Sequence, residues 1–199
     1  MKPKLSIITP CSRPKNLPLI EPSIDAVADF FDTTWLIVYD GLRVKEKDIG
    51  YLPDGVNHWE LYKAVVSKPG SAVGNAQNNH CLERIPSDNW VLFLSDDNVI
   101  HPDYGSRLRD AIEILPDKKC FVYQQAVGNW VRSCGPTLMH VGGIDLAQFT
   151  LHRSLIGARR LDHTKYEADG ILIEALYQEH PDLFAFLPVV ACYYNKLRG

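Results

Sequence analysis

The chain has 199 residues, 46% of them hydrophobic, and carries a formal net charge of −3 at pH 7. This length and apolar content suffice for one substantial core, so we expect a single domain over residues 1–199. The slightly acidic balance gives no signature of nucleic-acid binding, which favours a basic surface, and no apolar run is long enough to predict a membrane segment.

Strand and helix signals alternate through the first half of the chain. An apolar run at residues 5–10 is closed by proline and predicts a buried strand. Ser12 is expected to cap a helix with Pro14 in its first turn, and residues 34–41 predict a second strand ending in an acidic turn. The apolar positions of the helix share one face: Leu17, Ile20, Ile24, Val27, Ala28 and Phe31.

The following elements lead to an Asp-Asp-Asn segment. Residues 58–65 predict a third, partly exposed strand, and Ser71 is expected to cap the next helix. A hydrophobic strand at residues 89–98 runs into the acidic segment, and Pro102 opens another helix. This alternation predicts an α/β fold, with a mostly parallel central sheet and helices on both faces.

Beyond residue 118 the pattern becomes looser. Strands are predicted at residues 120–127 and 137–141, a helix at 169–179, and a late, proline-interrupted strand at 184–194. No internal repeat, low-complexity tract or linker divides the chain.

The five cysteines show no metal or disulfide pattern. Their odd number and the absence of a Cys-x-x-Cys pair argue against a disulfide framework or a zinc site. Cys11 follows the first strand, but no surrounding pattern supports a nucleophile. The first residues lack the long apolar core of a signal peptide, so we expect reduced thiols and a cytoplasmic protein.

Carboxylates follow two of the predicted strands. In an open parallel sheet, ligands bind beyond the carboxyl ends of the strands, where Asp40 and the pair Asp96 and Asp97 are expected. Two adjacent carboxylates repel each other, and a hard cation such as Mn²⁺ or Mg²⁺ relieves that repulsion and can hold the phosphates of a nucleotide. The alternative is turn chemistry, with Asn98 or Asp103 capping the next helix.

Four motifs resemble the nucleotide-binding half of the GT-A (Rossmann-like) fold of family-two glycosyltransferases. IITPCSRP closes the first strand and IVYDG the second; AQN, at residues 76–78, stands at the family's Ala-Arg-Asn helix motif. The fourth, VLFLSDDNVIHPD, resembles the aromatic-rich strand that carries a D-x-D-like motif followed by Pro-Asp. The resemblance implies one GT-A domain in which residues 1–100 bind a nucleotide sugar and residues 101–199 bind the acceptor.

The resemblance also implies a nucleotide site. Thr9, Pro10 and Asp40 would line the nucleobase and ribose pocket, with Arg13 nearby. Gln77 would belong to the same site, although arginine is common at its position in the family. Without a ligand, Thr9 and Pro10 would only terminate a strand, and Arg13 would be an exposed charge.

The metal site implied by the resemblance departs from the usual motif. Asp96 would contact the ribose or help to place the metal, and Asp97 would bind it directly. Ser95 stands where the family has its first aspartate, so metal binding would rest on Asp97 with water and phosphate oxygens.

Inverting glycosyl transfer needs a base that accepts the proton of the acceptor hydroxyl. YEADGILIEAL resembles the family segment that carries this base, which makes Asp169 the candidate and Glu167 the reserve. Ala168 replaces the usual glutamate, and the arginine often found one turn later is missing. The alternative role for Asp169 is that of a helix cap.

Other residues of the second half are candidates for the acceptor or leaving-group side. Gly143 resembles a family turn under the acceptor, and Trp130 could stack on a sugar ring, although tryptophan is more often a core residue. His152 or His163 could complete the metal shell or reach the diphosphate, as could the neighbouring arginines. These arginines are Arg153, Arg159 and Arg160, for which a solvated basic loop is the simpler reading.

Two alternatives to glycosyl transfer stay open. The chain could be a non-catalytic nucleotide- or glycan-binding module, or a nucleotidyltransferase, which is disfavoured because TPCSRPKNLP has no glycine-rich loop for a triphosphate. A UDP-sugar donor is suggested by family frequency alone, and the acceptor is undefined. Many family members carry further C-terminal elements, so an open acceptor cleft, or a homo-oligomer that completes it, is expected.

Overall fold

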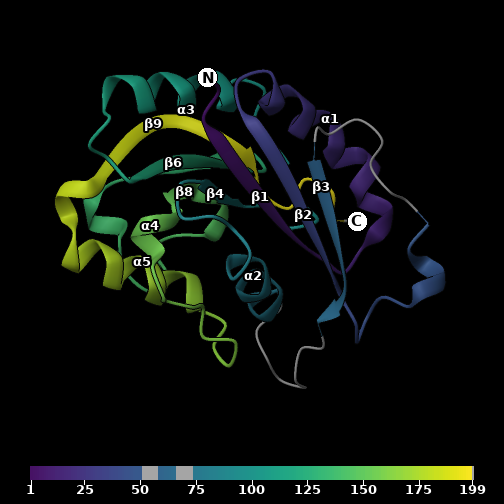
Figure 1. The fold of residues 1–199 in the computed structure, drawn as a ribbon. Helices are drawn as coiled ribbons and strands as arrows, with labels where there is room; N and C mark the ends of the chain where they lie inside the picture. The colour runs from purple at the N-terminus through teal and green to yellow at the C-terminus, as the bar shows by residue number, and fades with distance from the viewer. Residues whose placement is uncertain (51–57, 66–73, 199) are drawn as a thin grey trace.

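The computed structural model describes residues 1–50, 58–65 and 74–198. One nine-stranded sheet runs through them in the order β3-β2-β1-β4-β8-β6-β9-β5, with β7 paired to β6 off that path (Figure 1). Its strands are β1 (Lys4–Cys11), β2 (Asp32–Asp40), β3 (His58–Val65), β4 (Trp90–Phe93), β5 (Val99–Ile100), β6 (Cys120–Val127), β7 (Trp130–Arg132), β8 (Phe149–His152) and β9 (Phe184–Tyr193).

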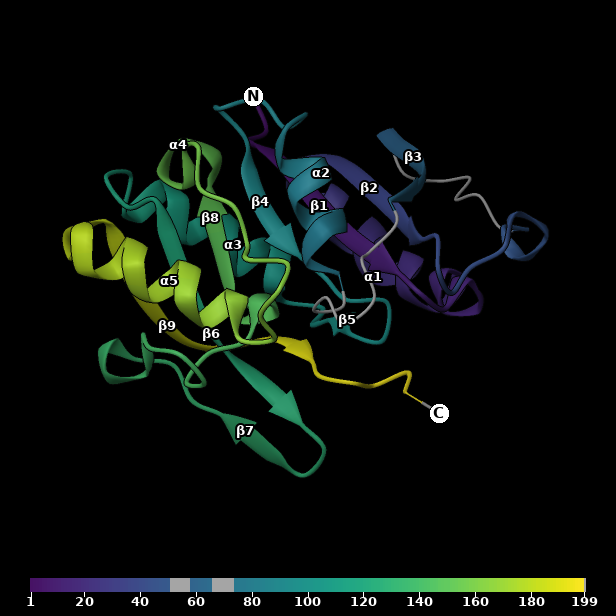
Figure 2. The same ribbon diagram turned by 90° about the horizontal axis from the view of Figure 1, so that it is seen from below.

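Helices cover both faces of this sheet, as expected for an α/β fold. The α-helices are α1 (Leu17–Ala28), α2 (Asn75–Leu82), α3 (Tyr104–Ile114), α4 (Arg153–Ile156) and α5 (Ala168–Glu179). Figures 1 and 2 show α1 and α3 on one face and α2, α4 and α5 on the other. Each face has its own buried core, one including Leu17, Ile24 and Leu108, the other including Leu82 and Leu172. The two cores therefore pack against opposite faces of the same sheet.

The first half of the sheet is parallel. β1 pairs with β2 and β4, and β2 pairs with β3, all in parallel register. Cys11 lies opposite Tyr39, and Ile8 lies opposite Phe93. The segments that follow β1, β2 and β4 therefore emerge at the same edge of the sheet, which brings the predicted carboxylates together.

The second half of the sheet is mixed. β8 is antiparallel to both β4 and β6, β9 is parallel to β6, and β5 and β7 are antiparallel to β9 and β6. The predicted late strand is confirmed as β9, and its register against β6 shifts where Tyr123 pairs with Leu187 and Gln124 with Val190. Pro188 lies in that shift, because proline cannot donate a ladder hydrogen bond.

Helix α1 buries the predicted face, with Leu17, Ile20, Ile24 and Val27 all in the core. The segment that precedes α1 differs from the prediction. A short 3₁₀ helix, η1 (Pro14–Asn16), precedes α1, and the Ser12 hydroxyl donates to Asp96 instead of capping a helix.

One predicted strand is wrong, two observed strands were not predicted, and one predicted helix cap lies outside the described residues. The strand predicted at residues 137–141 is wrong: a 3₁₀ helix, η3 (Pro136–Leu138), and a turn occupy this region. Strands β7 and β8 were not predicted. The predicted cap Ser71 lies outside the described residues, and α2 begins at Asn75 after Gly74, whose φ is +90°.

No helix in the described part of the chain has both the length and the apolarity needed to cross a bilayer. The remaining 3₁₀ helices are η2 (Glu46–Asp48), η4 (Leu146–Gln148) and η5 (Pro181–Leu183).

Candidate functional site

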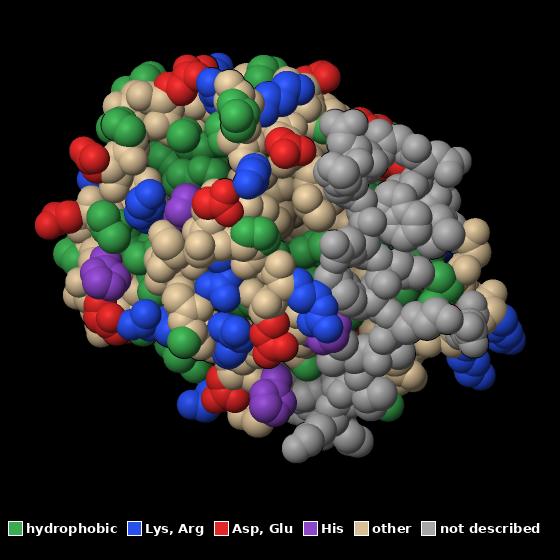
Figure 3. Space-filling view, in the orientation of Figure 1, with side chains coloured by type: hydrophobic (Ala, Val, Ile, Leu, Met, Phe, Trp, Pro, Cys, Tyr) green, Lys and Arg blue, Asp and Glu red, His purple; other side chains and the backbone are tan. Residues whose placement is uncertain are grey.

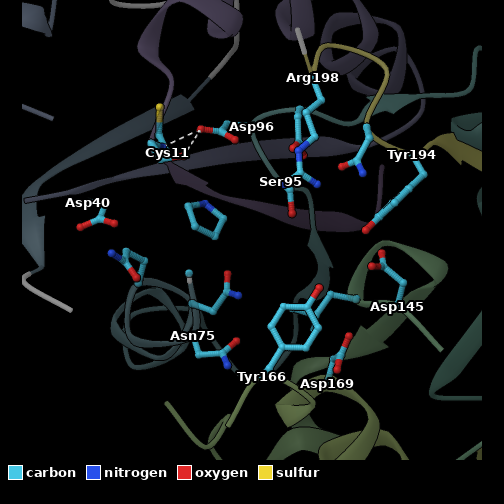
Figure 4. Close-up of a pocket in the computed structure, with 18 of the residues that line it drawn as sticks. Cys11, Asp40, Asn75, Ser95, Asp96, Asp145, Tyr166, Asp169, Tyr194 and Arg198 are labelled. Atoms are coloured by element: carbon cyan, nitrogen blue, oxygen red, sulfur yellow. Dashed lines mark hydrogen bonds between the residues drawn. The ribbon is translucent and has the colours of Figure 1, made fainter. Parts of the chain in front are cut away.

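A cavity of about 530 Å³ opens at the sheet edge where β1, β2 and β4 end. Its walls come from both halves of the chain (Figure 4). Asp40 lies at one end, Asp145 and Asp169 lie at the other, and Asp96 lies between them with Arg198 nearby. On the face drawn in Figure 3, acidic and basic side chains are intermingled. The described cavity lining likewise combines five aspartates with four arginines: Asp40, Asp96, Asp97, Asp145, Asp169, Arg13, Arg43, Arg132 and Arg198.

Asp96 holds the loop that follows β1. Its Oδ2 accepts hydrogen bonds from the backbone N–H groups of Ser12 and Arg13, both at 2.6 Å, and from the Ser12 hydroxyl at 3.0 Å. Its Oδ1 accepts from Arg13 Nη1 at 2.8 Å. Only 3% of Asp96 is exposed. The loop that follows β1 therefore supplies the hydrogen-bond partners of both carboxylate oxygens. In return, Asp96 fixes the position of Arg13.

Asp97 is the less satisfied member of the pair. It is 7% exposed, and its Oδ2 lies 3.3 Å from Arg13 Nη1. Burial and the neighbouring Asp96 charge raise the pKa of Asp97, while the guanidinium groups of Arg13 and Arg198 act in the opposite direction. A carboxylate in this position gains from any further cation that enters the cavity.

The residues present fit a metal ion only together with a phosphate-bearing ligand. Among the described residues, no group of three or more His, Cys, Asp or Glu side chains could hold a metal. Magnesium commonly takes one or two protein carboxylates and completes its shell with water and substrate phosphates. Asp97 would be the protein ligand in that arrangement, as its position at the cavity allows.

Asp40, Pro10 and Gln77 all line the end of the cavity built from β1, β2 and α2. Asp40 Oδ1 accepts from the N–H of Leu42 at 3.0 Å, and Oδ2 lies 3.5 Å from Arg43 Nε. These three residues line the cavity, and their contact with a nucleotide stays a prediction.

Thr9 does not share this position. It is fully buried and absent from the described cavity lining, and its hydroxyl accepts from Trp35 Nε1 at 2.9 Å. The prediction that Thr9 lines the nucleotide pocket is therefore corrected. Its neighbour Pro10 faces the cavity because successive residues of a strand point to opposite faces.

Asp169 lies in the first turn of α5, on the far wall of the cavity. Burial raises its pKa to about 6; hydrogen bonds from the N–H groups of Gly170 and Leu146 oppose this shift, and the charge of Asp145 adds to it. The Gly170 N–H donates to Asp169 Oδ1 at 2.8 Å. A carboxyl group with this pKa can accept a proton near neutral pH, as a general base must. Glu167, the reserve candidate, is exposed and outside the described cavity lining.

Asp145 is an unpredicted carboxylate on the same wall. It caps η4 by accepting from the Ala147 N–H at 3.0 Å, and it accepts from Gln125 Nε2 at 3.0 Å. The buried Gln125 in turn accepts from Arg132 Nη1 at 3.0 Å. The sequence analysis did not select Asp145, because the partners that hold it come from other strands.

Gly143 and Trp130 are adjacent to the cavity wall but are not part of its described lining. A Cβ on Gly143 would lie 2.5 Å from the Leu138 carbonyl oxygen, so glycine is required by its own turn, while Gly142 lines the cavity. Trp130 is 55% exposed on β7, and the Arg132 guanidinium lies 5.9 Å from its ring centroid. Trp130 is therefore not a core residue.

The predicted histidines do not reach the cavity. The His152 ring packs edge-on against Trp90 at 5.1 Å, and its Nδ1 lies 2.7 Å from Ser154 Oγ, at the opposite end of β4 from the acidic turn. Burial lowers the pKa of His152. His163 is exposed and outside the described lining. These positions correct the suggestion that either histidine completes a metal shell.

The neighbouring arginines are also engaged elsewhere. Arg153 donates to the Leu82 carbonyl at 3.1 Å, Arg159 pairs with Glu179, and Arg160 donates to the Arg159 carbonyl. Cys11 does line the cavity, but burial raises the pKa of its thiol far above the usual range, so it stays protonated. These three arginines therefore supply no phosphate ligand to the cavity, and Cys11 supplies no nucleophile.

Solved structures with the same fold include proteins seen with nucleotides. TarS from S. aureus (residues 1–349) matches with a TM-score of 0.68 and 14% identity over 96% of this chain and 60% of that chain. The same fragment has been solved with UDP and with UDP-GlcNAc. Glucosyl-3-phosphoglycerate synthase from Mycobacterium tuberculosis, solved with Mn²⁺, UDP and glucosyl-3-phosphoglycerate, matches with a TM-score of 0.61 and 13% identity over 95% of this chain and 71% of that chain.

A third structure belongs to a candidate glucose-1-phosphate thymidylyltransferase from Bacillus anthracis, solved with sucrose. It matches with a TM-score of 0.54 and 11% identity over 94% of this chain and 87% of that chain. No protein-family model and no curated protein sequence matches the chain. The chain spans about three fifths of the TarS fragment. The fold is that of GT-A nucleotide-diphospho-sugar transferases, as the sequence motifs predict.

Proposed function

We propose that the chain transfers a sugar from a nucleotide-diphosphate donor, a UDP-sugar, to an acceptor hydroxyl, with a divalent metal and with inversion. The observation that carries this proposal is one cavity with two different carboxylate environments. Asp97 is buried beside a second acid and gains from a cation, while Asp169 has a pKa suited to a base. The GT-A neighbours solved with UDP, and in one case with Mn²⁺, support the choice of donor.

The donor would lie along the carboxyl ends of the parallel strands. Pro10, Asp40 and Gln77 would contact the nucleoside, since they line the part of the cavity built from β1, β2 and α2. Figure 4 shows Asp40 at the opposite side of the cavity from Asp169. The diphosphate would then lie at the acidic turn, where Asp96 fixes Arg13 at 2.8 Å. A Mn²⁺ or Mg²⁺ ion held by Asp97 would dock the phosphates and neutralise charge on the departing diphosphate.

Asp169 would act on the acceptor. It would accept the proton of the acceptor hydroxyl while that oxygen attacks the anomeric carbon and the bond to the diphosphate oxygen breaks. UDP would leave with the bonding electron pair, and Asp169 would return its proton to solvent. The buried wall around Asp169 holds the carboxyl group in place through the Gly170 N–H.

The acceptor would enter past the rim that carries Tyr166, which is 82% exposed, and the β6–β7 hairpin with Trp130. The Gly142–Gly143 turn lies under this side and would allow close approach. A homo-oligomer could cover the same rim, and light scattering of the purified protein would detect it. A mass equal to one chain at micromolar concentration would remove the oligomer from the proposal.

Nucleotidyl transfer is the second candidate, because the Bacillus anthracis structure covers most of both chains. The loop after β1 argues against it. Its backbone N–H groups at Ser12 and Arg13, which a triphosphate would need, are both engaged by Asp96 at 2.6 Å. A non-catalytic binding module is the third candidate, and the raised pKa of Asp169 argues against it.

A thermal-shift screen followed by turnover assays tests the proposal. Nucleotide diphosphates and their sugars are compared with and without Mn²⁺, because a ligand that binds only the folded state raises the melting temperature. We expect UDP to shift the melting temperature in the presence of Mn²⁺ and a UDP-sugar to be hydrolysed slowly. Binding without turnover in any acceptor screen would favour the binding module. Turnover of a nucleoside triphosphate with a sugar 1-phosphate would favour nucleotidyl transfer.

A further inference from the structure

Residues 194–198, the strap, follow β9 and fold back onto the acidic turn. The N–H of Asn195 donates to Asn98 Oδ1 at 2.8 Å, and the N–H of Leu197 donates to the Asp97 carbonyl at 2.9 Å. Asn16 Nδ2 bonds the carbonyl oxygens of both Asp96, at 2.9 Å, and Leu197, at 3.4 Å. Asn98 is almost fully buried. The strap is therefore fixed to the same turn that presents Asp97.

The strap brings a guanidinium group into the cavity. Arg198 lines the cavity together with Tyr194 and Asn195, and its charge lowers the pKa of Asp97. Figure 4 shows Arg198 above Ser95 and beside Asp96, on the donor side of the cavity. A cation in this place lies next to the position assigned to the diphosphate.

The Arg198 guanidinium group has fewer contacts with the described carboxylates than those of Arg13 and Arg43. Arg13 forms ion pairs with Asp96 and Asp97, and Arg43 forms one with Asp40. Arg132 donates to Gln125 and stacks on Tyr194. Within the described residues, no carboxylate lies within 4.0 Å of the Arg198 guanidinium. One of its donors, Nη1, lies 3.3 Å from the side-chain oxygen of Asn195, and the remaining donors are available for an anion that enters the cavity.

We propose that Arg198 binds the diphosphate of the donor, so that the strap forms part of the donor site. This inference rests on the proposed function. A guanidinium group matches phosphate oxygens bidentately and keeps its charge at every accessible pH. Because the strap and Asp97 share a backbone hydrogen bond, the backbones that carry the anion-binding group and the metal-binding carboxylate are held together. Arg198 would thus add positive charge at the diphosphate, next to a metal ion that Asp97 would hold without a second aspartate at position 95.

Calorimetric titration of the full chain with UDP and with uridine, both in the presence of Mn²⁺, tests this inference. Arg198→Gln should weaken UDP binding by about 10-fold or more, since hydrogen bonds between charged groups are among the strongest in proteins. Uridine binding should stay unchanged, because the nucleoside lies at the other end of the cavity. Arg198→Lys should recover part of the loss by restoring the charge without the bidentate geometry.

Lys196→Gln is the matched control, since it removes the same charge from the same strap. Lys196 is exposed, lies over the Tyr193 ring at 5.8 Å, and is not part of the described cavity lining. It lines a second surface depression with Lys15 and Leu19, which Arg198 borders as well. Equal UDP affinity in the parent and Arg198→Gln would overturn the inference and leave the proposed function standing. Equal losses in the Arg198 and Lys196 variants would also overturn it, as a general charge effect. A parent protein that does not bind UDP would remove the proposed function itself.

Discussion

At the scale of single residues, Asp169 links the proposed catalysis to stability. Its pKa rises from the ordinary value of 3.8 to about 6 in the folded chain, chiefly through burial. Between these two values the folded state binds more protons than the unfolded state, so the contribution of Asp169 to stability falls as the pH rises through this window. Above pH 6 the protein therefore holds a destabilising charge in the place where the proposed mechanism needs a base.

Asp169→Asn separates these two effects. We expect turnover to fall by about 100-fold or more with little change in UDP affinity, because a general base is lost. The melting temperature should rise by a few degrees at pH 7.5, corresponding to at most about 3 kcal/mol for a pKa shift of this size. Differential scanning fluorimetry from pH 4 to 8 measures the change in melting temperature, and initial rates measure the loss of turnover.

The low-pH limit is the internal control for this variant. Near pH 4 the parent carboxyl group is largely protonated in the folded state, so the two proteins should melt at nearly the same temperature. For the parent, the rate should rise with pH up to about 6 and then level off. A pH-independent difference in melting temperature, or a near-normal rate, would rule out the base assignment.

Asp97 carries the metal prediction at the same scale. Asp97→Ala should abolish the Mn²⁺-dependent part of UDP binding and leave the fold intact, because the lost carboxylate is buried beside Asp96 and its charged form is disfavoured there. Calorimetric titration with and without Mn²⁺ measures this. Asp103→Ala, an exposed acid just beyond the turn, is the control. Unchanged Mn²⁺ dependence in Asp97→Ala would remove Asp97 from the site.

At the scale of elements, the first turn of α5 and the turn before η4 depend on each other. A Cβ on Gly170 would lie 2.7 Å from Val141 Cα and 3.1 Å from the backbone nitrogen of Gly142. Both contacts are with backbone atoms, which cannot rotate away. Glycine at position 170 therefore allows the cavity-lining turn to lie directly against the helix that carries Asp169.

Gly170→Ala should separate these two elements. Alanine is the better helix former, but the clash with backbone should outweigh that gain and destabilise the chain by about 1–3 kcal/mol. Turnover should fall as well, since Gly142 and Asp169 line the same cavity. Urea unfolding and rate measurements test both effects, with Gln178→Ala on the exposed side of α5 as the control. Increased stability in Gly170→Ala would contradict this prediction, because it would show that the turn at Gly142 can move to accommodate the added methyl group.

The elements that the sequence predicted correctly have strong local periodicity. The α1 face and the strands β1, β2 and β6 are continuous apolar patterns whose burial follows from the side chains themselves. Strands β7 and β8 have three and four residues, too few for a period-two signal. The apolar residues at 137–141 predicted a strand, but Pro136 opens a 3₁₀ helix there instead.

The sequence predicted those cavity-lining residues that follow strand ends and missed those whose positions depend on distant partners. Asp40, Asp96 and Asp97 come directly after predicted strands, so parallel register brings them to one edge. Alternation along β1 could have excluded Thr9 once Pro10 was chosen, because neighbours in a strand face opposite sides. Arg198 and Tyr194 follow the end of β9, so the same strand-end rule would have selected them. Asp145 depends on Gln125 and Arg132, whose positions no local pattern reveals.

At the scale of the whole molecule, both halves of the chain build one sheet and one cavity. The β4–β8 pairing joins the parallel part to the mixed part, and both cores extend across that junction. In the described part of the chain, residues 1–100 and 101–199 thus belong to the same hydrogen-bonded sheet. We therefore expect the two halves to unfold together.

Thermal unfolding should show a single transition with coincident midpoints by far-ultraviolet circular dichroism and tryptophan fluorescence. Trp35 and Trp90 report on the first half, since both are buried there. UDP with Mn²⁺ should move both midpoints equally, by an amount equivalent to about 2.7 kcal/mol when free UDP is 100 times its Kd. Two separated transitions, or a shift of only one probe, would contradict a single cooperative unit.

The direction of β1 has a practical consequence for handling the protein. Lys4 begins this strand and Cys11 ends it at the cavity, so the amino-terminal end lies roughly 25 Å away from the acidic turn, given the rise per residue of a strand. Arg198, by contrast, lines the cavity. A polyhistidine tail attached after residue 199 would hold metal-chelating groups within reach of Asp97, whereas the same tail before Met1 would not. Immobilisation on a sensor surface should therefore use the amino-terminal end.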